Sequence, residues 1–241
     1  MQNLMYSYFQ SILQKRRPLD RFCVPWFLRT IIITCLLVPS FDHADAKGSA
    51  VKATLSSKQV PEDVRQFVNG VVTSQDNQGM PFVILDKKRA KIFVYQRDGR
   101  NLGTAPALLG VAVGDDYVPG TGQKKLSEIP PEDRTTPAGR FKARLGKNLQ
   151  GEEVLWVDFD MGIAIHAVVT NHPEERRLQR LRSQNPKEHR ISWGCINVPK
   201  RFYVKTISPS FKRHGGMVYV LPERKTISDV FGTLSFQSSS L

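Results

Sequence analysis

Cys195 lies in a run of residues that could support nucleophilic catalysis, the sequence SWGCIN at positions 192–197. Gly194 directly before it lets other backbone approach closely. A turn there can also aim backbone N–H groups at one point, as an oxyanion hole requires. Such a cysteine needs a base for its thiol proton, and it should then have a depressed pKa and alkylate quickly. The alternative is an inert buried thiol, which is common in proteins.

Four histidines outside the N-terminal segment are candidates for that base: His166, His172, His189 and His214. His166 lies in the apolar run 162–169, which is typical of a buried strand, whereas His172 precedes a proline in the position of a helix cap. His189 lies in a charged loop, and His214 follows two basic residues at the predicted surface. We therefore expect His166 to be the base. The alternative is a core histidine whose ring nitrogens are satisfied by hydrogen bonds.

The elements that must position these side chains are mostly strands. Short apolar runs bounded by turn residues predict strands at 82–85, 90–95, 105–114, 141–145, 154–159, 162–169 and 215–221. Many short strands separated by turns are typical of a mainly β domain of sandwich or barrel-like form. A helix is predicted from Pro61, because apolar residues recur on one face at Val64, Phe67, Val68, Val71 and Val72.

A second helix is predicted over 173–182, where Leu178 and Leu181 would contact the body of the domain. Arginines dominate its remaining surface, among them Arg176, Arg177 and Arg180. The segment is therefore expected to be either a solvated basic helix or a lid that presents positive charge to an anionic substrate. Residues 115–134, rich in glycine, proline and charge, are predicted to form a long loop.

The first 46 residues have the layout of a secretory signal peptide. Basic residues precede the apolar run 31–38, and Ala44-Asp45-Ala46 follows it as a small-x-small cleavage site. The apolar stretch 30–41 is shorter than the ~20 residues that span a bilayer, and the alternative to cleavage is an uncleaved anchor. Export to the periplasm or cell envelope would leave Cys195 without a disulfide partner, since the other two cysteines lie in the removed segment.

The chain is strongly basic: 35 lysine and arginine residues against 22 aspartate and glutamate residues give a formal charge of +13. Such a protein is attracted to anionic surfaces such as wall polymers or lipid headgroups. No nucleic-acid recognition motif accompanies the charge, and no HExxH or Cys/His cluster indicates zinc. We expect no metal, no cofactor and no nucleic-acid partner, and membrane contact only through the N-terminal segment.

Two motifs together make the chain resemble the L,D-transpeptidase family, whose YkuD-type catalytic domain occurs in bacterial cell-wall enzymes. That family has a histidine on a strand, then Ser/Thr-His-Gly-Cys, an apolar residue and often Asn. Here these are His166 and the run 192–197. The family also has a Thr-Pro-x-Gly-x-Phe segment before the histidine, which is 136–141 here. The order of the strands matches as well, and the resemblance covers roughly 81–222.

The chain departs from the family pattern at three places. Trp193 stands where the family has histidine; an indole cannot titrate, although its backbone N–H can donate to an oxyanion and its ring can wall the acyl-donor pocket. Between His166 and Cys195 lie 28 residues, more than is typical. The excess corresponds to the arginine-rich segment 171–190, which looks like a lid insertion. Ala167 follows the histidine where many members have glycine.

The predicted organisation follows from these features. A signal peptide occupies 1–46, a linker with the N-terminal helix 47–80, the catalytic domain 81–222 with its insertion at 171–190, and a C-terminal tail 223–241.

The resemblance implies a transpeptidase that acts on peptidoglycan stem tetrapeptides through a thioester on Cys195, with His166 as acid and base. The acceptor would be the amine of a second stem, a D-amino acid or a wall-linked protein. If water were the acceptor, the protein would be an L,D-carboxypeptidase or an amidase. A non-catalytic peptidoglycan-binding protein is the alternative from another class; Trp193 favours it slightly, and the joint retention of Cys195, Gly194 and His166 disfavours it.

In such an enzyme, supporting roles are expected for other residues. The backbone N–H groups of Cys195, Gly194 and Trp193 would stabilise the oxyanion, and the carbonyl of Ala167 would orient His166. Ser192 and Asn197 would hold the catalytic loop in shape or make ordinary turn hydrogen bonds. Substrate carboxylates would be met by Arg176, Arg177 and Arg180.

Overall fold

The computed structural model describes residues 60–232, and the predicted signal peptide at 1–46 lies outside them. The elements run in the order α3 (Glu62–Thr73), β1 (Phe82–Asp86), β2 (Lys91–Tyr95), β3 (Asn101–Pro106), β4 (Leu109–Gly110), β5 (Gly139–Lys147), β6 (Glu153–Asp158), β7 (Ile163–Ala167), α4 (Arg177–Arg182), β8 (Arg190–Ser192), β9 (Ile196–Val198), α5 (Lys200–Phe202), α6 (Ser208–Phe211), β10 (Gly216–Leu221) and α7 (Ile227–Phe231). None of the described helices is long and apolar enough to span a membrane.

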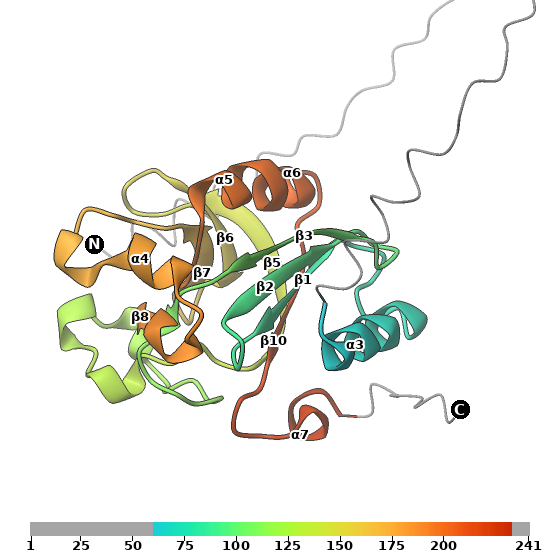
Figure 1. Cartoon of the computed structure of the whole chain (residues 1–241), viewed down its shortest axis with the longest axis horizontal. Coiled ribbons are helices and arrows are strands. Elements are labelled where there is room, and N and C mark those ends of the chain that lie inside the picture. Colours follow the sequence, from blue (N-terminus) through green and yellow to red (C-terminus); the bar gives the residue numbers. More distant parts are fainter. Residues whose placement is uncertain (1–59, 233–241) are drawn as a thin grey trace, which may run out of the picture. The chain divides into compact units, whose positions relative to one another are not determined.

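Within residues 60–232, eight strands form one sheet in the order β3-β2-β1-β10-β5-β6-β7-β9 (Figure 1). Its neighbouring strands are antiparallel except where β1 pairs with β10 and β7 with β9. Beyond the end of β3, Leu108 exchanges both backbone hydrogen bonds with Asn197 of β9, at 2.8 and 3.0 Å. The two ends of the sheet are joined through Leu108, and the mainly β, barrel-like fold is confirmed.

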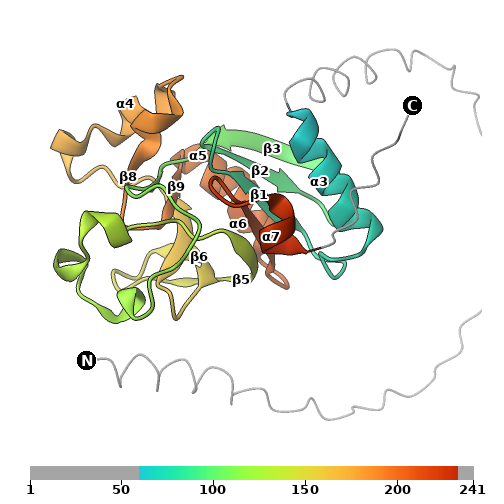
Figure 2. The ribbon, with the colours of Figure 1, turned by 90° about the horizontal axis from the view of Figure 1, so that it is seen from below.

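The central strands β1 and β10 are buried along their whole length because both faces of the sheet are covered, and all their residues except Asp86 at the end of β1 are uncharged. On one face, Phe82 and Ile84 pack with Phe67 of α3 and Phe231 of α7, and the rings of Phe67 and Phe231 lie 4.9 Å apart. Figures 1 and 2 show α3 along this face. On the other face, the helical segment 200–211 contributes Tyr203, Ile207 and Phe211 to the core.

The predicted N-terminal helix is confirmed as α3, which begins directly after Pro61. Glu62 and Asp63 lie in its first turn, where carboxylates interact favourably with the helix dipole. Of the side chains that the apolar spacing places on one face, Val72 is partly buried, and the other four are buried: Val64, Phe67, Val68 and Val71. This helix contributes to the second layer of the core and lies outside the segments that form the site.

The strand predicted over 105–114 is interrupted, and this part of the prediction is wrong. The chain leaves the β2 ladder after Pro106, and the backbone N–H of Ala107 donates to the carbonyl of Ala90. Leu108 then pairs with β9, and only Leu109–Gly110 forms the short strand β4, against β8. A strand that changes partners cannot be inferred from its own apolar run, because its new partners β8 and β9 lie about 80–90 residues further along the sequence.

The helix predicted over 173–182 is broken at Arg176, which has a left-handed backbone with φ of 52°. A 3₁₀ turn covers Pro173–Glu175, and α4 begins at Arg177. Leu181 is buried as expected, whereas Leu178 is 48% exposed and does not join the core. His172 precedes the 3₁₀ turn without capping it through its side chain.

Two helical segments near the C-terminus were not predicted. Residues 200–211 form α5, a π-helical turn at Tyr203–Ile207 and α6. Pro209 follows this turn; its ring carries no N–H and excludes a regular helix through the preceding residues. The predicted tail 223–241 contains α7, which Thr226 caps by accepting from the N–H of Asp229 at 3.1 Å.

Candidate active site

The turn that carries Cys195 requires glycine at position 194. Gly194 has a backbone φ of 120°, which residues other than glycine rarely adopt. A Cβ atom there would lie 2.6 Å from the carbonyl oxygen of Thr135 and 2.7 Å from the Cδ1 atom of Ile163. The backbone before the cysteine is therefore packed directly against two other segments, as the sequence predicts for this glycine.

The side chain of Ser192 stabilises the turn through two hydrogen bonds to its backbone. Its hydroxyl donates to the carbonyl of Cys195 at 2.6 Å and accepts from the N–H of Gly194 at 3.2 Å. This second bond occupies the Gly194 N–H that the family resemblance assigns to the oxyanion. Among the described residues, no hydrogen bond occupies the backbone N–H of Trp193 or of Cys195, so these two remain as candidate donors.

Thr136 connects the Thr-Pro segment to the cysteine turn. Its buried hydroxyl donates to the carbonyl of Gly194 at 2.8 Å and accepts from the N–H of Gly110 at 2.9 Å. Three distant segments are joined at this single hydroxyl: 110, 136 and 194. The two motifs that make the sequence resemble one family are thus in direct contact.

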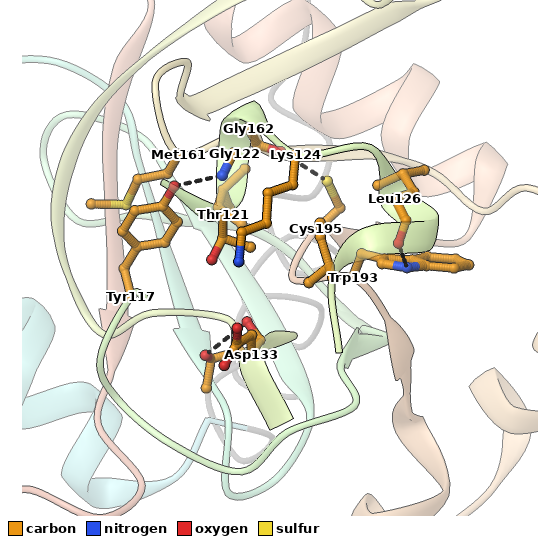
Figure 3. Close-up of a pocket in the computed structure, with 13 residues that line it drawn as sticks. Tyr117, Thr121, Gly122, Lys124, Leu126, Asp133, Met161, Gly162, Trp193 and Cys195 are labelled. Atoms are coloured by element: carbon orange, nitrogen blue, oxygen red, sulfur yellow. Dashed lines mark hydrogen bonds between the residues drawn. The ribbon is translucent and has the colours of Figure 1, made fainter. Parts of the chain in front are cut away.

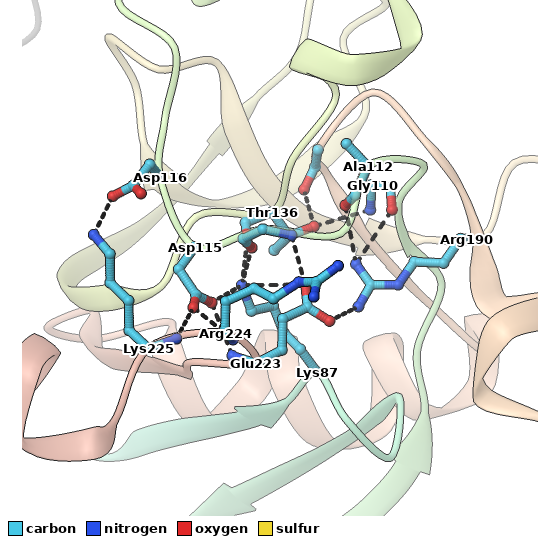
Figure 4. A network of polar contacts seen from close by, with 12 residues as sticks. Lys87, Gly110, Ala112, Asp115, Asp116, Thr136, Arg190, Glu223, Arg224 and Lys225 are labelled. Carbon is cyan, nitrogen blue, oxygen red and sulfur yellow. Dashed lines mark hydrogen bonds and ion pairs between the residues drawn. The ribbon is translucent and has the colours of Figure 1, made fainter.

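A buried ionic network holds the backbone of Thr136 in place (Figure 4). The ammonium of Lys87 donates to Asp115 at 2.8 Å and to the carbonyl of Thr136 at 2.9 Å, and lies 3.5 Å from Glu223. Arg190 pairs with Glu223 and donates to the carbonyls of Gly110 and Ala112. Desolvation lowers the pKa of Lys87, and its two carboxylate neighbours oppose that shift. The network anchors both the start of the cysteine segment and the base of the 115–134 loop.

The thiol of Cys195 is half-buried and lies 3.5 Å from the carbonyl oxygen of Gly162. Desolvation raises the pKa of this thiol, and the N–H of Ala164 and the charge of Arg177 oppose the shift only in part. The depressed pKa expected of a catalytic thiol is therefore absent from this resting arrangement. Deprotonation must be coupled to an adjacent base if the cysteine is to react.

His166 lies on β7 directly opposite Asn197 on β9. Cys195 directly precedes β9, and its thiol faces the carbonyl of Gly162, directly before β7. The Nδ1 atom of His166 lies 2.8 Å from the carbonyl of Ala167, which is the orienting contact that the resemblance implies. Its Nε2 atom lies 3.3 Å from the side-chain nitrogen of Asn197. Desolvation lowers the pKa of His166.

The three arginines proposed for substrate carboxylates do not converge. Arg177 is buried, pairs with Glu175 and donates to the side-chain oxygen of Asn197 at 2.6 Å. Arg176 is exposed and donates to Gln179. Arg180 donates to the backbone carbonyls of Glu175 and Glu188. Only Arg177 therefore reaches the residues around Cys195, and it does so from inside the protein.

A pocket with a volume of about 80 Å³ adjoins Cys195 (Figure 3). Most of its wall comes from the predicted 115–134 loop, and the rest comes from Thr135, from 161–163, and from Trp193 and Cys195. The lining residues are Tyr117, Thr121, Gly122, Lys124, Leu126, Ile129, Asp133, Thr135, Met161, Gly162, Ile163, Trp193 and Cys195. The insertion 171–190 does not line this pocket. Sequence reasoning missed the loop as a functional element, because its only signal was a length of about 20 residues without regular structure.

Trp193 forms one wall of the pocket and holds the loop in place. Its indole N–H donates to the carbonyl of Leu126 at 3.0 Å. The guanidinium carbon of Arg134 lies 5.0 Å from the centre of its ring, which is within cation–π range. The tryptophan thus connects the cysteine turn to both ends of the loop segment 126–134.

The other three histidines lie apart from this arrangement. His189, predicted in a charged loop, is buried, and its ring nitrogens contact the carbonyls of Ala107 and Ser183, each at 3.1 Å. His172 is exposed beside Glu174, and His214 is exposed as predicted. Within residues 60–232, no group of three or more His, Cys, Asp or Glu side chains is placed to hold a metal ion.

Comparison with known proteins gave structural neighbours only. No protein-family model and no curated protein matches the sequence. The fold is similar to that of the Ldtfm–avibactam carbamoyl enzyme, with 18% identity and a TM-score of 0.33 over 59% of this chain and 49% of that one. It is similarly close to a cysteine-to-serine mutant of Enterococcus faecium L,D-transpeptidase, with 18% identity and a TM-score of 0.31 over 59% of this chain and 50% of that one. The chain spans about half the length of each of these neighbours.

Proposed function

We propose that the protein is a cell-envelope L,D-transpeptidase that transfers the acyl group of a peptidoglycan stem tetrapeptide through a thioester on Cys195. The observation that carries the proposal is the position of Cys195, which lines a pocket and directly precedes β9, the strand on which Asn197 lies opposite His166 of β7. The signal-like residues 1–46 support export to the envelope. The basic charge would favour contact with anionic wall polymers.

In the first half-reaction, the thiol proton passes to Nε2 of His166 as the sulfur attacks the carbonyl at the L-centre of the diamino acid. A carbon–sulfur bond forms, and the carbon–nitrogen bond to the terminal D-alanine breaks. The imidazolium returns the proton to the leaving amine. Because the thiol pKa is raised and the imidazole pKa is lowered, both groups are neutral at rest. The proton must therefore move during the attack rather than before it.

In the second half-reaction, the amine of an acceptor attacks the thioester carbonyl. A new amide bond forms, the carbon–sulfur bond breaks, and the proton of the amine returns through His166 to the thiolate. The free backbone N–H groups of Trp193 and Cys195 would stabilise the oxyanion of both steps. One such donor is typically worth about 3 kcal/mol of transition-state stabilisation. The acceptor is a second stem, a free D-amino acid or a wall-linked protein.

Two observations favour a second candidate, a non-catalytic peptidoglycan-binding protein. The raised thiol pKa and the contact between Asn197 and Nε2 of His166 leave the pair unactivated at rest. In that case the pocket would bind a stem peptide without acyl transfer.

The deciding experiment incubates the full-length chain with a purified disaccharide tetrapeptide, with and without a D-amino acid, and reads the products by mass. The test variant is Cys195→Ala, and the matched control is Cys23→Ala/Cys35→Ala, which removes the other two thiols. A crosslinked dimer or an exchanged tetrapeptide that requires Cys195 supports the transpeptidase. Tripeptide alone indicates the carboxypeptidase. No product from the control protein, together with retained binding of the tetrapeptide, would replace the enzyme with the binding protein.

A further inference from the structure

Arg177 is buried beside the candidate base although it belongs to the segment 171–190. Its side chain is 8% exposed. The Nε atom donates to the carboxylate of Glu175, and one terminal nitrogen donates to the side-chain oxygen of Asn197 at 2.6 Å. A buried guanidinium that satisfies two partners of fixed position has little freedom to turn outward to a substrate. Arg177 instead contacts Asn197, whose side-chain nitrogen in turn lies next to His166.

The chemistry of the donors determines how this network is oriented. A guanidinium can only donate, so the Asn197 atom that faces Arg177 must be the oxygen. The amide NH₂ group of Asn197 must then face Nε2 of His166, which lies 3.3 Å away. Nε2 must accept this bond, and it can do so only when it carries no proton. The other ring nitrogen faces the Ala167 carbonyl at 2.8 Å and must donate.

We propose that Arg177 is a positioning residue which, acting through Asn197, holds His166 as a neutral imidazole with its proton on Nδ1. This inference rests on the proposed function only in taking His166 as the base. The insertion thereby supplies a buried cation that selects the tautomer in which Nε2 carries no proton and accepts a bond from Asn197. An imidazolium would place its Nε2–H against the amide NH₂ of Asn197 and would be disfavoured.

The charges around His166 act in the same direction. Arg177 from α4 lowers its pKa, Glu152 from the turn between β5 and β6 raises it, and desolvation lowers it most. Cys195 from the cysteine turn is neutral at rest because burial raises its pKa. Loss of the Arg177 cation would also release Asn197, whose oxygen could then turn toward Nε2 and accept a bond from an imidazolium. Both changes raise the pKa of His166.

The test is ¹⁵N NMR of the histidine rings in the full-length chain, with His166 assigned by comparison with His166→Gln. Above its titration range, His166 of the unchanged protein should show a protonated Nδ1 and an unprotonated Nε2. The opposite tautomer would overturn the proposal without any variant. This readout needs no substrate, so it remains decisive if the protein forms no product.

Three variants then separate charge, position and fold. Arg177→Met should raise the midpoint of the His166 titration by about one pH unit. Arg177→Lys, which keeps a cation and a donor, should stay close to the unchanged protein. Arg182→Met removes the same charge from an exposed site on the same helix and is the matched control. An equal shift in the Arg177 and Arg182 variants, or no shift in either, would overturn the proposal. Product formation by the unchanged protein, measured in parallel, reports on the proposed function alone.

Discussion

The hydroxyl of Thr136 donates a 2.8 Å hydrogen bond to the carbonyl of Gly194, the residue directly before the candidate nucleophile. The same hydroxyl accepts from the N–H of Gly110. A threonine far away in the sequence thus fixes the backbone of the cysteine turn, and its own backbone is held by Lys87. The backbone position of the cysteine turn therefore depends on these buried contacts.

Thr136→Val should destabilise the protein and impair the cysteine turn together. The substitution keeps the shape but leaves the Gly194 carbonyl and the Gly110 N–H unpaired in a buried place, at a cost of about 2 kcal/mol. Urea unfolding would measure the stability, and mass analysis of the products would measure the activity. Thr136→Ser keeps the hydroxyl and should remain closer to the unchanged protein in stability. An unchanged stability in Thr136→Val would contradict the role of the hydroxyl bonds, and an equal loss in Thr136→Ser would show that the methyl contacts contribute as much as those bonds.

Gly194→Ala should abolish product formation in the folded protein. The added Cβ would meet the Thr135 carbonyl at 2.6 Å, so the turn must move away from the Thr-Pro segment. Gly151→Ala is the control, because Gly151 also has a positive φ, of 80°, but has open space around its Cβ position. Circular dichroism would confirm folding in both variants. Retained activity in Gly194→Ala would contradict the close packing described at this turn.

Lys87→Met should lower stability by about 3–5 kcal/mol, because Asp115 would remain buried without its cation, whereas Glu223 keeps its pair with Arg190. Burial acts to raise the pKa of Asp115. Hydrogen bonds from Lys87 and from the N–H groups of 223–225 outweigh this effect and lower the pKa to about 2. The carboxylate therefore contributes stability above its unfolded pKa, and this contribution is lost as the pH falls from about 4 to about 2.

Urea midpoints measured across that range would test the assignment of Lys87. Without the ammonium, the folded pKa of Asp115 should rise toward its unfolded value, so the loss of stability on acidification should be smaller and should end at a higher pH. An acid profile in Lys87→Met that is identical to that of the unchanged protein would exclude this ion pair as the cause.

Trp193→Phe should weaken substrate binding more than it slows the chemical step. The phenyl ring keeps an apolar wall but loses the hydrogen bond to the Leu126 carbonyl, so the loop over the pocket is held less firmly. We expect a KM several-fold higher with kcat nearly unchanged, measured by product mass over a range of tetrapeptide concentrations. A fall in kcat at constant KM would instead place the indole in the reaction itself.

Alkylation of Cys195 by iodoacetamide should be slow at neutral pH and should accelerate only above the ordinary thiol pKa of about 8.5, because burial raises its pKa. Activity should behave differently at low pH. The lowered pKa of His166 keeps the base unprotonated below its ordinary value of about 6.5, so the acidic limb of the rate profile should fall below that pH. Free cysteine under the same conditions is the reference for alkylation. Rapid alkylation at neutral pH would contradict the resting state described here.

The sequence was informative where residue type determines geometry by itself. Gly194, Cys195 and Thr136 belong to short motifs whose backbone requirements are local, and His166 lies in a strand recognisable from its apolar run. The role of Arg177 could not be predicted, because it depends on a left-handed residue at 176 that breaks the helix and turns the next side chain inward. The role of 117–135 as a pocket wall could not be predicted either, because a loop has no periodic sequence pattern that indicates which residues it contacts.

The pairing of Leu108 with Asn197 limits how a peptide can reach the site. The strand that carries Asn197 is bonded to β7 on one side and to Leu108 on the other, so it has no open edge. An extended substrate cannot dock here by adding a strand to the sheet, as peptides do on many binding domains. The substrate must instead bind across the face of the strands, through contacts with side chains and with the cysteine turn. Selectivity should therefore depend on the side chains of the substrate more than on its main-chain hydrogen bonds.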